Sequence, residues 1–70
     1  MSTSYLVVVE RAPHNYSAYV PDVPGVAATG ETREETLQEL RAALRMHLAG
    51  LQEDGVEIPR PATSVDYVSV

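Results

Sequence analysis

Residues 19–40 read Y-V-P-D-V-P-G-V-A-A-T-G-E-T-R-E-E-T-L-Q-E-L, and this stretch decides the fold of the chain. Pro21 and Pro24 cannot donate to a sheet ladder, and each biases the residue before it toward extended geometry. Pro21–Gly25 is therefore predicted to form a fixed turn between two strands. Seven residues after this turn, Thr32 marks the start of a helix. The local chemistry thus predicts a strand-turn-strand-helix unit.

The predicted helix begins with a capping box and continues as one apolar stripe. Thr32 is followed three residues later by Glu35, so the hydroxyl can accept a free backbone N–H while the carboxylate reaches back to the cap. Leucines then recur at spacings of three and four, as expected for a helix that packs on a sheet: Leu37, Leu40, Leu44, Leu48 and Leu51. Gly55 is the expected stop. Gly50, inside the helix, indicates either close approach of another backbone or simple tolerance near the helix end.

Four strands are predicted around this helix. The apolar run Tyr5–Glu10 and the alternating run Tyr16–Val20 form a plausible hairpin, and Val26–Thr29 follows the turn as a short third strand. The last segment, Thr63–Val70, is also rich in β-branched residues and is predicted to be a fourth strand. The element order is therefore β-β-β-α-β, an α+β fold with one helix on one face of a small sheet. If the first three strands form a meander, the helix returns the chain so that the fourth strand lies beside the first and parallel to it. The predicted strand order is therefore 3-2-1-4.

The small size of the chain favours self-association on physical grounds. Seventy residues form one domain, which buries only about 60% of the surface that its unfolded chain exposes. The chain has no cysteine, so it lacks disulfides to reinforce so small a core. A single helix covers one sheet face only, whereas the first strand carries apolar residues on both faces. We therefore predict a homodimer or a larger homo-oligomer.

Charge and hydropathy narrow the class of partner. Ten acidic residues against five arginines give a net charge of −5, which opposes binding to nucleic acid through its phosphates. The same charge favours an encounter with a basic protein, although acidity also serves solubility alone. No apolar stretch is long enough for a membrane span, and the N-terminus lacks a secretion signal. A cytoplasmic protein is expected, without direct contact to nucleic acid or membrane.

The sequence offers no catalytic, metal-binding or cofactor-binding residues. The carboxylates fall mainly on the exposed side of the helix or in turns, and neither histidine has a partner at metal-ligand spacing. Phosphate-binding glycine loops and nucleophile elbows are absent from the sequence. An alternative to an interaction module is a small ligand-binding protein with an apolar pocket between helix and sheet, using His47 or a tyrosine as its polar group. A purely structural oligomer is a third possibility.

The motif in residues 19–26, Y-V-P-D-V-P-G-V, is followed by A-T-G-E-T-R-E-E at residues 28–35 and by the run His47-Leu48-x-Gly-Leu51. In combination these residues resemble the HicB-like antitoxin family, and the similarity covers nearly the whole chain. One departure is Val26, which stands where such proteins often carry cysteine. A second is length, because family antitoxins commonly continue into a C-terminal DNA-binding domain. We expect residues 1–70 to be a single HicB-like domain without that module.

The resemblance implies a partial ribonuclease-H-like fold without nuclease chemistry. It also implies a non-enzymatic role: binding a small basic HicA-type toxin, an mRNA-cleaving ribonuclease, and covering its active site. The rigid turn provides the candidate partner-binding residues, because rigid loops suit recognition: Pro21, Asp22, Pro24 and Gly25. A purely structural corner is the other interpretation of this turn.

Overall fold

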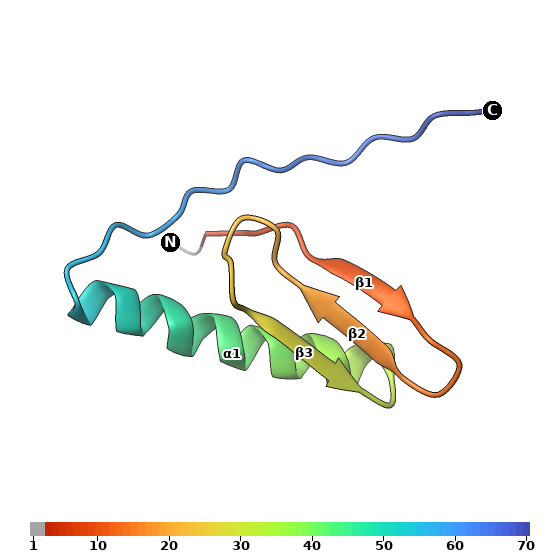
Figure 1. Cartoon of the computed structure of the whole chain (residues 1–70), viewed down its shortest axis with the longest axis horizontal. Coiled ribbons are helices and arrows are strands. Elements are labelled where there is room, and N and C mark those ends of the chain that lie inside the picture. The colour runs from red at the N-terminus through yellow and green to blue at the C-terminus, as the bar shows by residue number, and fades with distance from the viewer. Residues whose placement is uncertain (1–2) are drawn as a thin grey trace.

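The computed structural model describes residues 3–70 and shows an α+β fold in two layers (Figure 1). Three strands form one antiparallel sheet in the order β1-β2-β3. They are β1 (Val8–Arg11), β2 (Tyr16–Tyr19) and β3 (Ala27–Gly30). One helix, α1 (Arg33–Glu53), crosses a single face of this sheet. The α+β class and the single covering helix are therefore confirmed.

The registers of the sheet explain which side chains face the helix. Ala18 of β2 lies opposite Val9 of β1 and Ala28 of β3, and all three belong to the helix side. The next row, Val8, Tyr19 and Ala27, points to the other face because successive strand residues alternate. The predicted alternation of residues 16–20 is thus confirmed. The side chains of this second row are more exposed to solvent than Ala18, and Tyr19 among them is 44% exposed.

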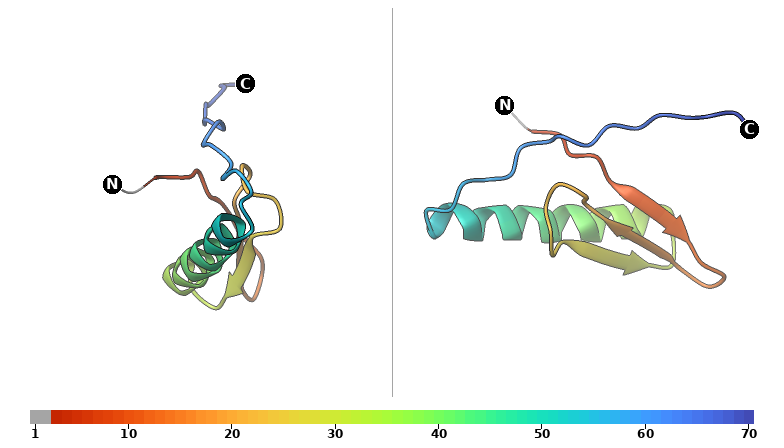
Figure 2. Two further views of the ribbon diagram at one scale, coloured as in Figure 1. Left: turned by 90° about the vertical axis from the view of Figure 1, so that its left-hand side faces the viewer. Right: turned by 45° about the horizontal axis from the view of Figure 1, so that its top comes forward.

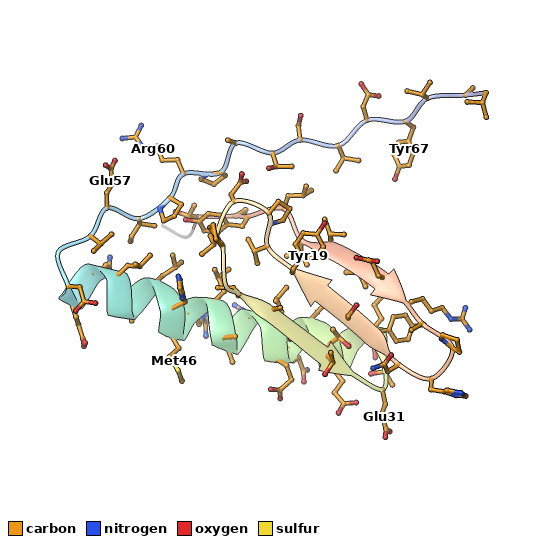
Figure 3. All side chains as sticks on the ribbon, in the orientation of Figure 1. Tyr19, Glu31, Met46, Glu57, Arg60 and Tyr67 are labelled. Carbon is orange, nitrogen blue, oxygen red and sulfur yellow. The ribbon has the colours of Figure 1, made fainter. Side chains whose placement is uncertain are left out.

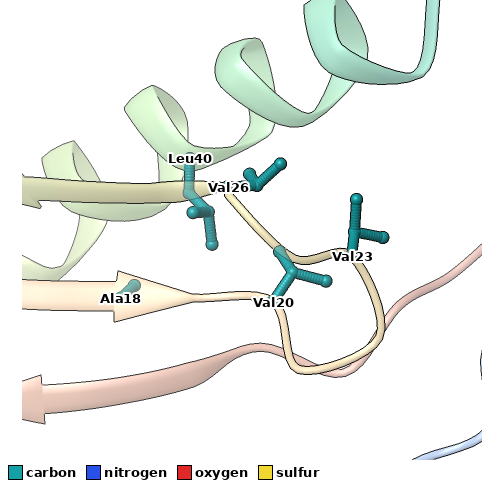
Figure 4. Packing of buried hydrophobic residues seen from close by; sticks show 5 residues of the cluster. All are labelled: Ala18, Val20, Val23, Val26 and Leu40. Atoms are coloured by element: carbon teal, nitrogen blue, oxygen red, sulfur yellow. The ribbon is translucent and has the colours of Figure 1, made fainter. Parts of the chain in front are cut away.

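The core gathers at one end of the sheet, beneath the middle of α1 (Figure 4). Leu40 points from the helix toward residues of β2 and of the turn that follows it. Five buried apolar residues make up this cluster: Ala18, Val20, Val23, Val26 and Leu40. All four other leucines of the stripe are half-buried, and of these Leu44 and Leu48 pack against the cluster. The predicted leucine stripe therefore faces the sheet, and the leucines in the middle of the stripe are the ones that contact the core.

The fourth strand and the strand order 3-2-1-4 are wrong for this structure. Residues 56–70 leave the helix as an extended chain that pairs with no strand among the described residues (Figures 1 and 2). Every residue from Pro61 to Val70 is exposed. A high β-propensity therefore predicted the extended conformation correctly but not a partner for its backbone, since pairing depends on tertiary contacts. With three strands, the ribonuclease-H-like arrangement is not confirmed.

Helix α1 starts and stops where the sequence predicts. The hydroxyl oxygen of Thr32 accepts the backbone N–H of Glu35 at 3.0 Å. At the other end, the N–H of Gly55 donates to the carbonyl of Gln52 at 3.1 Å, and Gly55 has a φ of 69°, which favours glycine. Glu34 and Glu35 lie in the first turn, where negative charge is favourable. The capping hydroxyl and the glycine stop are confirmed.

Removal of the capping hydroxyl gives a first testable result. We expect Thr32→Ala to lower the free energy of unfolding by about 1 kcal/mol, because the N–H of Glu35 loses its acceptor. Urea unfolding followed by circular dichroism at a fixed protomer concentration measures this change. Thr32→Ser is the matched control, since serine keeps the acceptor oxygen. A serine variant as unstable as the alanine variant would contradict the capping role.

Candidate functional site

The predicted partner-binding turn joins β2 to β3 at the end of the sheet that contains the core. The N–H of Val20 donates to the carbonyl of Val26 at 3.4 Å, and the N–H of Val23 donates to the carbonyl of Val20 at 3.1 Å. Gly25 has a φ of 89°, a conformation that L side chains rarely adopt. Two backbone bonds and one glycine thus close the turn, so its rigidity is built into the sequence.

The four candidate residues of the turn differ in accessibility. Pro24 and Gly25 are exposed, whereas Pro21 and Asp22 are half-buried. Between them, Val23 is completely buried and points into the core (Figure 4). The local sequence pattern does not predict this anchor, because the burial of Val23 depends on contacts with distant residues. The turn therefore combines a structural corner at Val23 with a small exposed tip.

Asp22 holds the C-terminal segment against the turn. One carboxylate oxygen accepts the backbone N–H groups of Ala62 and Thr63, each at 3.0 Å. The other oxygen accepts the Thr63 hydroxyl at 2.7 Å. These donors stabilise the ionised form and hold the pKa of Asp22 below its usual value, with the backbone N–H of Ala62 as the largest cause. Nothing in the local sequence pattern predicts this contact, because forty residues separate the partners.

Attachment of the C-terminal segment should therefore depend on pH. A depressed pKa in the folded state means that the attachment is fully present above the ~3.9 of an unperturbed aspartate and is lost as pH falls through the lower folded pKa. We expect the amide signals of Ala62 and Thr63 to shift with a midpoint below that value in an NMR titration. In Asp22→Asn this titration should disappear. A wild-type midpoint at or above ~3.9 would contradict the role of Asp22.

A second contact joins the C-terminal segment to the other end of the chain. The Tyr5 hydroxyl donates to the carbonyl of Pro59, and Tyr5 also packs against the core. Together, Tyr5 and Asp22 tie residues 59–63 to the domain at two points. Beyond Thr63 the chain projects freely, and Tyr67 is 90% exposed (Figure 3).

His47 lies on the side of α1 that faces the turn. A Cβ built on Gly25 would lie 4.0 Å from Cε1 of His47, and the His47 side chain is half-buried. The turn and the helix therefore meet here, so His47 fits the interpretation of a structural histidine. Within residues 3–70, no group of three histidine or carboxylate side chains could hold a metal ion.

The surface carries shallow, open hollows. One of about 420 Å³ separates the N-terminal segment from α1 and is lined by Tyr5, Leu44 and Leu48 together with Arg41 and Arg45. A larger one of about 640 Å³ lies between the β1–β2 turn and the start of α1, and its walls are mostly polar. His47 lines neither hollow. Tyr5 lines the smaller hollow, but its hydroxyl already donates to the carbonyl of Pro59. The alternative of a ligand pocket with His47 or a tyrosine as its polar group is therefore not favoured.

Comparison with known proteins gives the family. Residues 5–70 match the family described as "HicB_like antitoxin of bacterial toxin-antitoxin system". This match covers nearly the whole chain. The protein therefore belongs to the HicB-like antitoxin family, as its turn and helix-start motifs predicted. Within the part of the chain described by the structure, no helix has both the length and the apolar character needed to cross a bilayer.

Two curated relatives agree with this assignment. The chain is 31% identical over 65 residues to a 14.9 kDa protein in the rep-hol intergenic region of Haemophilus phage HP1. It is 32% identical over 47 residues to a UPF0150 protein of Helicobacter pylori. These alignments cover 93% and 67% of this chain, but only 49% and 65% of the two relatives. The chain thus spans about half to two thirds of the length of the relatives it matches.

Proposed function

We propose that this protein is an antitoxin that binds a HicA-type, mRNA-cleaving toxin and covers its active site. Membership of the HicB-like antitoxin family carries the proposal. An antitoxin of this kind acts by occupying a surface, so the role requires no catalytic group, metal or cofactor. We propose accordingly that the protein acts in the cytoplasm beside the toxin and its RNA substrate, without making its own contact to nucleic acid.

The charge distribution supports a basic protein as partner. The net charge is −5, and the exposed side of α1 carries several of the carboxylates. Glu34, Glu35 and Glu39 all lie there with exposed side chains. A toxin that binds RNA needs positive charge at its active site, so an acidic surface both attracts it and competes for the same groups.

The tip of the β2–β3 turn is the part of the antitoxin proposed to touch the toxin. Pro24 is exposed there, on a turn whose backbone is already fixed by hydrogen bonds and by Gly25. A preformed tip loses little conformational entropy on binding, which favours affinity. Pro21 and Asp22 precede the tip in the same turn and are half-buried. Asp22 also holds the C-terminal segment through its hydrogen bonds.

Co-expression with a cognate HicA-type toxin tests the proposal. We expect the wild-type chain to restore growth and to co-purify with that toxin. Continued growth arrest without co-purification, at equal expression of folded protein, would overturn the proposed function.

A pair of arginine variants tests the binding surface separately. Pro24→Arg places a positive charge on the proposed tip, whereas Met46→Arg places the same charge on α1 at a side chain that is 78% exposed and points away from the sheet (Figure 3). We expect only Pro24→Arg to weaken co-purification. Equal effects of the two variants would remove the turn from the interface while leaving the antitoxin function intact.

A further inference from the structure

The segment 64–70 has the composition of a buried strand in an exposed position. Its sequence is S-V-D-Y-V-S-V, and its backbone is extended. Yet Val68 and Val70 are among its fully exposed side chains, together with the 90% exposed Tyr67. Val65 and Tyr67 share one side of such an extended chain, and Val68 and Val70 share the other. The segment thus offers apolar groups on two faces and an unpaired backbone.

The base of this segment is fixed, so its direction is set by the domain. Asp22 holds Ala62 and Thr63, and Tyr5 holds Pro59. Pro59 and Pro61 keep the residues before them extended, which prevents the chain from turning back sharply. Figures 1 and 2 show that the segment leaves on the β1 side of the sheet and then diverges from it.

β1 presents the matching surface. It pairs with β2 on one side, and within the described residues its other edge pairs with no strand. Val9 faces the core and Val8 faces the opposite side, and both are only half-buried. An edge strand with apolar side chains on both faces invites a further strand of the same character. Segment 64–70 has that character.

We infer that two copies of this chain exchange residues 64–70, each segment adding as a strand to the free β1 edge of the other copy. A second copy fits better than the segment's own β1, because the fixed base and the proline-restricted hinge direct the segment away from its own sheet. In a two-fold symmetric dimer each segment pairs with the β1 edge of the other copy, so neither segment and neither edge is left unpaired. This inference does not depend on the proposed antitoxin function.

Mixed-label NMR tests the exchange directly, and it needs no assumption about register. Uniformly ¹³C,¹⁵N-labelled chain is unfolded and refolded with an equal amount of unlabelled chain. An isotope-filtered NOE spectrum then reports contacts between copies only. We expect intermolecular NOEs between residues 65–70 and residues 8–11. Absence of these NOEs from the filtered spectrum would overturn the inference, whether or not an unfiltered spectrum shows contacts between the two segments within one chain.

Two matched substitutions test whether the segment holds the copies together. Val68→Asp charges the segment, and Met46→Asp charges a similarly exposed apolar position on α1, which is 78% exposed against 85% for Val68. Light scattering after gel filtration should show twice the 7.6 kDa chain mass for the wild type and for Met46→Asp. Val68→Asp should elute at the mass of one chain while its circular dichroism stays helical. A dimer that survives Val68→Asp, or a wild type with the mass of one chain, contradicts the exchange.

Discussion

Replacing Leu40 with alanine should lower the free energy of unfolding by about 3 kcal/mol, within the 2–5 kcal/mol typical of buried leucines. Leu40 is 2% exposed and is the helix residue of the buried cluster. A chain of this length has a total stability of roughly 4–10 kcal/mol at 0.05–0.15 kcal/mol per residue. The substitution therefore removes a large share of it, and Tm should fall by about 10–25 °C.

Met46→Ala is the matched control for this measurement. Both residues are long apolar side chains on α1, but Met46 is 78% exposed and points away from the sheet (Figure 3). We expect its stability to stay within about 0.5 kcal/mol of the wild type. Thermal unfolding of both variants should be compared at one protomer concentration, because the proposed exchange between copies would make Tm depend on concentration. Equal losses in the two variants would contradict the assigned core.

Replacing Gly30 with alanine should be the second severe change, with a loss of about 1–3 kcal/mol. A Cβ on Gly30 would lie 2.7 Å from Oγ1 and 2.9 Å from the backbone N of Thr36. Thr36 cannot move aside easily, since it is completely buried and its hydroxyl donates to the carbonyl of Thr32 at 2.8 Å. The new methyl group must therefore push the end of β3 away from the first turn of α1.

Gly50→Ala separates this steric effect from the general effect of alanine. Nothing lies within 4 Å of a Cβ on Gly50, so alanine there should stabilise the helix by up to about 1 kcal/mol. Denaturant unfolding should therefore move the two midpoints in opposite directions. A Gly30→Ala variant as stable as the wild type would contradict the close approach of β3 to α1. The same open space at Gly50 favours simple tolerance of this glycine within the described chain.

Local chemistry explains what could be predicted from the sequence. The ends of α1 follow from Thr32 and Gly55, whose effects act over three or four residues. The faces of β2 follow from strict alternation, and the turn follows from two prolines and Gly25. The same stretch, residues 19–40, also identified the family, because its motif combines these local signals in one order.

Contacts between distant residues explain what could not be predicted. The attachment of Thr63 to Asp22 spans 41 residues, and the burial of Val23 depends on a helix that begins ten residues later. The extended conformation of residues 63–70 follows from β-propensity, but the edge that would accept their backbone does not. The turn itself was thus predicted, whereas its part in partner binding stays a prediction, and nothing in the sequence indicates that Asp22 is already engaged by Ala62 and Thr63.

RNA cleavage by the purified toxin tests the central claim most directly. A purified HicA-type toxin is mixed with a labelled RNA, and this protein is added in increasing amounts. We predict that cleavage falls in proportion to the added protein and reaches background near equivalence, as the proposed covering of one active site by one antitoxin surface requires. Cleavage that continues unchanged in a large excess of the folded protein would contradict the antitoxin function.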